Sequence, residues 1–263
     1  MINTQQLTKT LGDFTAVDAL CLDVAAGEVF GLLGPNGAGK TTTIKMLITL
    51  LVPTSGCATV DGLDVVKRAG DVRRVIGYVP QILSADGTLT GFENLMVFAK
   101  LYDVPRSERK QCVDEALQFM GLADSANSMV RNYSGGMIRR LEIAQAFVHH
   151  PRVLFLDEPT VGLDPVARQV VWERIEHLRR DYGTTIFVTT HYMDEAEKLC
   201  HRVAVMDFGK VAVIGTPAEL RASLGRPDAT LDDVFAHYTG GQLDTGGNWR
   251  ETRQMRRTVQ RLG

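Results

Sequence analysis

A glycine-rich segment near the start of the chain has the residue types that hold phosphate groups. It runs Gly34-Pro35-Asn36-Gly37-Ala38-Gly39-Lys40-Thr41, fits the spacing GxxxxGK[ST], and is followed by Thr42. Glycines let a backbone wrap closely and point consecutive N–H groups at phosphate oxygens. Lys40 can then reach the β and γ phosphates of a nucleoside triphosphate, while the Thr41 hydroxyl can ligate Mg²⁺. A plain glycine-rich turn is the alternative, and the apolar strand before the segment and the helix after it favour the phosphate site.

Two acidic residues follow an apolar run much further along the chain. Asp157 and Glu158 end the run VLFLDE, which is typical of a strand that is covered on both faces of a parallel sheet. Ligands bind at the carboxyl ends of such strands, so we expect Asp157 to hold Mg²⁺, directly or through water. Glu158 can then accept a proton from an attacking water. An ordinary acidic strand end beside Pro159 is the alternative, which the phosphate loop makes less favourable.

The elements that must position these residues alternate between strand and helix. Strands are expected at 16–24, 28–33, 57–62, 75–81, 153–156 and 184–190, and a hairpin at 202–215. Helices are expected from Lys40, over 164–180 and after Thr216, and the stretch 89–149 has a helical pattern. The alternation predicts an α/β fold with a largely parallel sheet, into which the helical stretch is inserted. Beyond Gly225 the apolar periodicity fades.

Composition limits the class of protein. The chain has 263 residues, of which 44% are hydrophobic and 23% are charged, as in an ordinary soluble globular protein. Collagen-like, disordered and disulfide-scaffold chains are excluded. The net charge of −2 lacks the basic excess of a duplex-binding protein, so we expect no nucleic-acid partner.

Cysteine spacing indicates a reducing compartment, and hydropathy indicates that no segment spans a membrane. Cys21, Cys57, Cys112 and Cys200 form no CxxC motif, and we expect reduced, buried thiols. The first residues lack the pattern of a secretion signal. No apolar run approaches about 18 residues, so a role at a membrane would need another chain to span the bilayer.

Further motifs resemble those of one family. Tyr133-Ser134-Gly135-Gly136-Met137 resembles the LSGGQ signature of ATP-binding cassette (ABC) proteins, and Gly162-Leu163-Asp164-Pro165 resembles their D-loop. Gln81 resembles the Q-loop glutamine and His191 the switch histidine, and all these motifs stand in the family's order over about residues 1–220. The resemblance implies a P-loop NTPase core at 1–84 and 150–224 that includes an antiparallel β subdomain. It also implies an α-helical signature subdomain at 85–149 and a short C-terminal extension at 225–263.

The resemblance also implies roles for residues. The substrate would be ATP with Mg²⁺, and Thr41, Gln81 and Asp157 would hold the metal. Gln81 would sense the γ-phosphate, Glu158 would be the catalytic base, and His191 would hold the γ-phosphate. Ser134, Gly135, Gly136 and Met137, with Asp164 of the D-loop, would complete the site of a second chain in a head-to-tail dimer. The other histidines (His149, His150, His177, His201 and His237) have no such context and are expected to be structural.

Three segments resemble one branch of the family, the drug-resistance and ABC-2 type exporter ATPases. These are YSGGM, the segment from His191 to Leu220, and ATLDDVFAHYTG. The resemblance implies a peripheral cytoplasmic chain at the inner face of the cell membrane, paired as a homodimer or heterodimer. It would power a separate permease that exports a drug, lipid or similar compound. A soluble ABC ATPase without a transporter is the alternative, and a nucleotide-dependent regulatory module without turnover is a third reading.

The sequence departs from the family pattern at a few positions. Leu11 stands where relatives often carry an aromatic residue that stacks on adenine, and Phe14 is a possible substitute. Gln145 stands where the branch often has Arg. The Arg-rich end, residues 248–263, fits either a solvated tail or a contact for acidic lipid or a partner.

Overall fold

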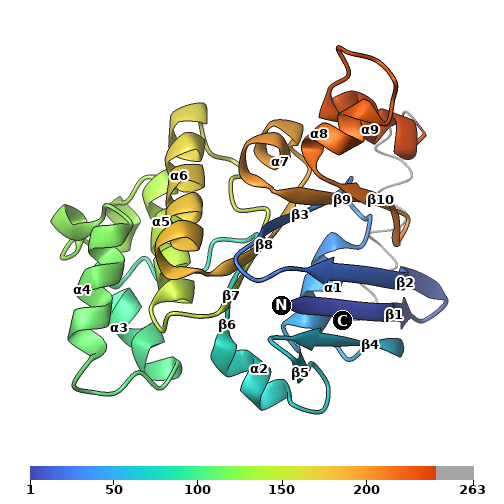
Figure 1. Ribbon diagram of the computed structural model, residues 1–263. Coiled ribbons are helices and arrows are strands. Elements are labelled where there is room, and N and C mark those ends of the chain that lie inside the picture. Colours follow the sequence, from blue (N-terminus) through green and yellow to red (C-terminus); the bar gives the residue numbers. More distant parts are fainter. Residues whose placement is uncertain (241–263) are drawn as a thin grey trace.

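A six-stranded sheet forms the centre of the fold (Figure 1). The computed structural model describes residues 1–240. The strand order is β10-β9-β3-β8-β7-β6, with the bounds β3 (Val29–Leu33), β6 (Ile76–Val79), β7 (Val153–Asp157), β8 (Thr185–Thr190), β9 (Arg202–Asp207) and β10 (Lys210–Gly215). All neighbouring pairs are parallel except β9 with β10. The α/β fold with a mostly parallel sheet is thereby confirmed.

A smaller antiparallel sheet packs beside the first, in the order β2-β1-β4-β5 (Figure 1). Its strands are β1 (Ile2–Leu11), β2 (Phe14–Val24), β4 (Ser55–Val60) and β5 (Leu63–Asp64). The sequence pattern misses β1, because most of its residues are polar and shifts in register break the apolar alternation. Leu20 of this sheet, Ile44 of α1 (Lys40–Leu47) and Phe155 of β7 share one apolar cluster, so α1 and the smaller sheet cover one face of the larger sheet.

Three helices pack against one another within the predicted helical stretch, at the side away from the small sheet (Figure 1). They are α3 (Gly91–Leu101), α4 (Arg109–Phe119) and α5 (Gly135–Phe147), with short 3₁₀ turns at Ala123–Ser125 and Val130–Asn132. Thr90 and Glu93 form a capping box that begins α3, and Thr216 and Glu219 form another at the start of a later helix. The other helices are α2 (Ala69–Val75), α6 (Pro165–Tyr182), α7 (Met193–Leu199), α8 (Pro217–Ala222) and α9 (Leu231–Tyr238).

Two expectations from the sequence are wrong. Helix α9 lies beyond Gly225, where periodicity was expected to fade; it is short, and its apolar side is formed by Leu231, Val234 and Phe235. The thiols are also not all buried. Cys200 is buried and Cys112 is intermediate, whereas the cysteines at 21 and 57 are exposed. Cys21 lies between two buried residues of β2, and Cys57 precedes a buried residue of β4, so both point away from the core.

Within residues 1–240, none of the helices combines the length and the apolar character that crossing a bilayer requires. The Arg-rich end at 248–263 lies outside the described residues.

Candidate functional site

The site lies where the parallel strands end. The glycine-rich loop follows β3, Gln81 follows β6, Glu158 follows β7, and His191 follows β8. Because these strands are parallel neighbours or near neighbours, their carboxyl ends meet at one edge of the sheet. The fold thereby brings together residues that are far apart in the sequence.

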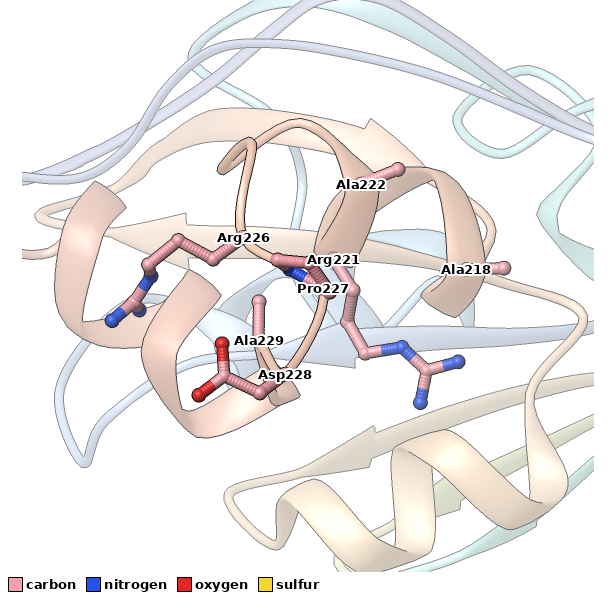
Figure 2. A pocket seen from close by; sticks show the side chains of 7 residues that line it. All are labelled: Ala218, Arg221, Ala222, Arg226, Pro227, Asp228 and Ala229. Atoms are coloured by element: carbon pink, nitrogen blue, oxygen red, sulfur yellow. The ribbon is translucent and has the colours of Figure 1, made fainter.

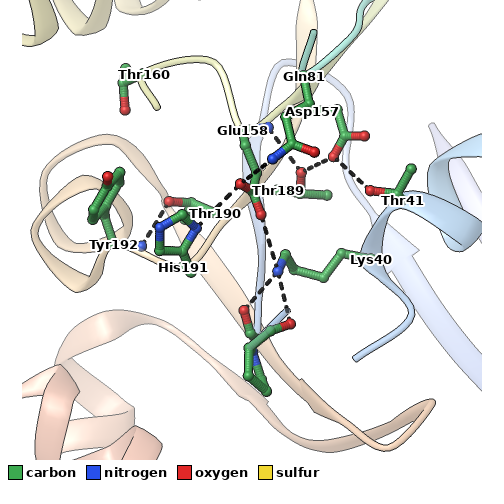
Figure 3. A network of polar contacts seen from close by, with 12 residues as sticks. Lys40, Thr41, Gln81, Asp157, Glu158, Thr160, Thr189, Thr190, His191 and Tyr192 are labelled. Atoms are coloured by element: carbon green, nitrogen blue, oxygen red, sulfur yellow. Dashed lines mark hydrogen bonds and ion pairs between the residues drawn. The ribbon is translucent and has the colours of Figure 1, made fainter. Parts of the chain in front are cut away.

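Glu158 is the centre of a polar network at this edge (Figure 3). Its Oε1 lies 3.2 Å from Nζ of Lys40. Its Oε2 accepts a hydrogen bond from Nε2 of Gln81 at 3.0 Å and lies 3.3 Å from Nδ1 of His191. The residues predicted to bind phosphate (Lys40), to sense it (Gln81) and to act as the switch (His191) therefore all contact the predicted base, Glu158.

The backbone of Glu158 adopts a strained conformation that aims this side chain. Its φ is 49°, in the left-handed region that residues other than glycine seldom adopt. The peptide N–H of Glu158 donates to the carbonyl oxygen of Thr189 and to its hydroxyl, both at 3.1 Å. Bonds from the adjacent strand β8 thus hold the turn in place.

The glycine-rich loop closes around the Lys40 ammonium. Nζ of Lys40 donates to the carbonyl oxygens of Gly34 at 2.7 Å and Pro35 at 3.1 Å. Gly39 has a φ of 106°, and a Cβ there would collide with the carbonyl oxygen of Ala16. Glycine is therefore required at this position, where the loop turns into α1.

Burial and neighbouring charges shift the pKa values of Lys40 and Glu158 in opposite directions. Burial lowers the pKa of Lys40, and the charge of Glu158 opposes that shift. Burial by itself would raise the pKa of Glu158, but the contact with His191 and the charge of Lys40 outweigh it, so the pKa lies below its usual value. Glu158 is accordingly ionised at neutral pH.

Asp157 and Thr41 supply a second group of oxygens beside Glu158. Oδ1 of Asp157 accepts hydrogen bonds from the hydroxyls of Thr41 at 3.3 Å and Thr189 at 2.5 Å, and the Asp157 side chain is buried (Figure 3). A carboxylate, a hydroxyl and the nearby Gln81 amide are hard oxygen donors, which is the donor chemistry that Mg²⁺ prefers. These residues fit the predicted metal site.

Sequence reasoning missed Thr189, although this residue forms hydrogen bonds with both acidic residues. Its hydroxyl donates to Asp157 and accepts from the peptide N–H of Glu158. The signal available in the sequence was the pair Thr189-Thr190, which ends the segment TTIFVTT after the apolar residues at its centre. Arg139, which is fully buried and bonds the backbone of Gln81, was missed as well.

The signature residues lie elsewhere on the chain's surface. Ser134 caps α5 by accepting a hydrogen bond from the Met137 N–H at 3.3 Å. Asp164 caps α6 in the same way, accepting from the Ala167 N–H at 2.9 Å. Within residues 1–240, no hydrogen bond or ion pair joins 134–137 to the glycine-rich loop. A role of the signature in the chain's own site therefore has no support from this geometry.

Leu11 and Phe14 face each other across the turn that joins β1 to β2. Leu11 is 48% exposed and Phe14 is 59% exposed. Phe14 thus presents an accessible aromatic ring, and its contact with adenine remains a prediction. Gln145, the other departure from the family pattern, is buried, and its Nε2 donates to Oδ1 of Asn94 at 3.2 Å.

A shallow pocket lies between α8 and α9, away from this network (Figure 2). It is lined by Ala218, Arg221, Ala222, Arg226, Pro227, Asp228 and Ala229. Both arginines are already paired with carboxylates, Arg221 with Glu197 and Arg226 with Asp233. We assign no ligand to this pocket.

Several known proteins are similar to this chain in sequence. The family model of the ABC transporter matches residues 17–161. The chain is 47% identical over 224 residues to the daunorubicin/doxorubicin resistance ATP-binding protein DrrA of Streptomyces peucetius, covering 85% of this chain and 68% of the relative. It is 44% identical over 222 residues to the Nod factor export ATP-binding protein I of Paraburkholderia xenovorans, covering 84% and 73%.

Solved structures of ABC proteins are similar to this chain as well. One, described as the ATP binding subunit of an ABC transporter, superposes with a TM-score of 0.80 at 28% identity and covers 90% of this chain and 99% of its own. Another, a dimeric ATP-binding cassette in a post-hydrolysis state bound to ADP and Pi, gives a TM-score of 0.73 at 26% identity, with 82% and 98% covered. The chain therefore belongs to the ABC transporter family, as an ATP-binding subunit that resembles its drug-resistance exporter ATPases.

Proposed function

We propose that the chain hydrolyses ATP with Mg²⁺ as one of two paired cassettes and thereby powers a separate permease in the cell membrane. The observation that carries this proposal is the convergence of Lys40, Gln81 and His191 on the carboxylate of Glu158. A structural ion pair would need one cation. The presence of three different polar partners around a single base is typical of a site that handles a phosphate and a water molecule.

Lys40 and the glycine-rich loop bind the phosphates, and Glu158 accepts the proton of the attacking water. The two tasks are linked, because the charge of Lys40 lowers the pKa of Glu158. A phosphate that attracts the Lys40 ammonium weakens this effect, so the pKa of Glu158 rises and the carboxylate becomes a stronger base. Substrate binding thus prepares the base for its reaction.

Thr41, Asp157 and Gln81 would hold Mg²⁺, which supplies positive charge that stabilises the negative charge on the phosphates. The hydroxyl of Thr189 orients Asp157 by donating to its Oδ1. His191 orients Glu158 and the terminal phosphate. These residues position charges and exclude water, since Asp157 and Glu158 are both buried.

The signature of one chain completes the site of the other. Ser134 and Gly135 are exposed at the start of α5, where unpaired N–H groups and the positive end of the helix dipole favour phosphate. The related dimeric cassette bound to ADP and Pi supports a paired arrangement. The relatives named for daunorubicin/doxorubicin resistance and for Nod factor export support a role in export. The chain would then lie at the inner face of the membrane, against a permease that spans it.

Glu158→Gln tests the proposal, because it keeps the size of the side chain and removes the base. We expect ATP binding to persist and turnover to fall by about 10²–10⁴-fold, the usual contribution of a general base. Glu173→Gln is the matched control, since Glu173 is exposed on α6. Hydrolysis by Glu158→Gln at the rate of the unmodified chain would contradict the proposal.

A further inference from the structure

The segment that carries Gln81 has no regular secondary structure between β6 and α3. Its backbone groups therefore need partners outside a helix or sheet. Ile82 and Leu83 do not anchor it, because their side chains are 81% and 50% exposed. Polar side chains of the signature helix α5 supply the anchors instead.

Arg139 of α5 is 2% exposed and lies against this segment. Its Nη1 donates to the carbonyl oxygen of Pro80 at 2.8 Å, and its Nη2 donates to the carbonyl oxygen of Gln81 at 2.9 Å. The rigid fork of a guanidinium suits two adjacent acceptors of this kind. Arg139 therefore holds the two peptide groups that flank the Cα of Gln81.

Glu142 lies three residues further along α5 and completes the attachment. It is 2% exposed, and its Oε2 accepts from Nη1 of Arg139 at 3.1 Å. Its Oε1 accepts from the peptide N–H of Ser84 and from the Ser84 hydroxyl. Gln145, another three residues on, bonds Asn94, which in turn bonds both backbone groups of Asp86.

Stability alone does not explain a buried ion pair at this place. Replacing such a pair with apolar residues of similar volume is often neutral or stabilising, because desolvation of the charges is costly. Here the charged groups satisfy backbone atoms of the segment from which Gln81 reaches Glu158. The pair is therefore explained by the position that it gives to Gln81.

We propose that Arg139 is a positioning residue, which holds Gln81 against Glu158 and thereby joins the chain's own phosphate site to the signature helix. Ser134 begins the helix that Arg139 belongs to, so a shift of Gln81 toward phosphate must either move α5 or break the bonds of Arg139. The two ends of this connection would serve two different ATP molecules. The inference rests on the proposed ATPase function.

The test replaces both charges, so that no unpaired charge remains buried. Arg139→Met/Glu142→Gln removes both charges, keeps the length of the side chain at position 142 and leaves an acceptor for the Ser84 N–H. We expect kcat to fall about tenfold while the affinity for ATP changes less than about twofold, as for a residue that acts in turnover rather than in binding. Arg140→Met is the matched control, because Arg140 also bonds two carbonyls, but those of Met120 and Gly121.

A double-mutant cycle separates positioning from a general structural role. In a Gln81→Ala background the same pair of substitutions should lower kcat less than about twofold, because Arg139 then has no side chain to position. An equal fall in both backgrounds would overturn the inference. Hydrogen exchange of residues 81–86 should be at least about threefold faster in the double variant, and unchanged exchange would also overturn it.

The Arg139 variants and Glu158→Gln test the inference and the proposed function separately. If the unmodified chain hydrolyses ATP through Glu158 and the Arg139 variants keep full kcat, the inference is wrong and the proposed function stands. If Glu158→Gln hydrolyses ATP as fast as the unmodified chain, the proposed function is wrong, whatever the Arg139 variants do.

Discussion

Nζ of Lys40 lies 3.2 Å from Oε1 of Glu158, and both side chains are almost completely buried. The group that would meet phosphate and the group that would accept a proton are thus each other's partners. A bound phosphate competes with Glu158 for the ammonium, and this competition connects nucleotide binding to the basicity of Glu158.

Replacing Lys40 with Met should weaken ATP binding at least about tenfold, because a charge-assisted hydrogen bond contributes about 1.5–3 kcal/mol. Titration with a fluorescent ATP analogue measures the affinity. Lys45→Met, on the exposed side of α1, serves as the control. Binding as tight as in the unmodified chain would remove Lys40 from the phosphate site.

Thr189→Val should lower kcat about tenfold and raise the Mg²⁺ concentration needed for half-maximal activity. Its hydroxyl bonds Asp157 and the backbone of Glu158, and an unmet buried acceptor costs about 1–3 kcal/mol. Thr184→Val is the control, because Thr184 directly precedes the first residue of β8 and is buried like Thr189. A Mg²⁺ titration that is unchanged by Thr189→Val would count against its role in orienting Asp157.

The pH dependence of hydrolysis should shift when His191 is replaced. Glu158 must be ionised to act, so kcat/KM falls as the pH drops through the pKa of this group. The contact with His191 lowers that pKa, and its removal in His191→Gln should therefore move the acid limb to higher pH. Because the pKa of Glu158 in the unmodified chain lies below the ordinary value of 4.5, profiles that extend below that pH would show the shift, with His177→Gln as the control. An acid limb at the same pH in both proteins would contradict the link between His191 and Glu158.

Phe14→Ala should weaken ATP binding about fivefold or more, because stacking of an aromatic side chain on a base contributes about 1–3 kcal/mol. Inorganic triphosphate carries no base, so its affinity should not change. Leu11→Ala provides a comparison at the facing position. If Phe14→Ala binds ATP normally, adenine is recognised elsewhere.

The sequence predicted the parts of this protein that depend on local pattern. The apolar runs that form β3, β7 and β8 are continuous, and the glycine-rich loop has a fixed spacing, so both were recognisable. The strand β1 was not recognisable, because Gln5 and Gln6 face solvent and a bulge interrupts the alternation of buried and exposed residues.

The contacts of Thr189 and Arg139 could not be predicted from the sequence, for a different reason. Thr189 meets Asp157 across two neighbouring strands, and Arg139 meets Gln81 across the junction of helices and sheet. Neither residue type at its position signals a partner that is tens of residues away. Motif spacing identified the residues that react, whereas the fold was needed to identify the residues that position them.

Pairing of two chains around ATP is the central claim, and the mass of the Glu158→Gln protein in solution tests it most directly. Light scattering should show a single chain without nucleotide and a dimer with ATP and Mg²⁺. Adding Ser134→Arg should abolish the dimer while ATP still binds, since Ser134 is exposed at the signature. A Glu158→Gln protein that stays a single chain at saturating ATP, or a dimer that Ser134→Arg does not disturb, would contradict the account.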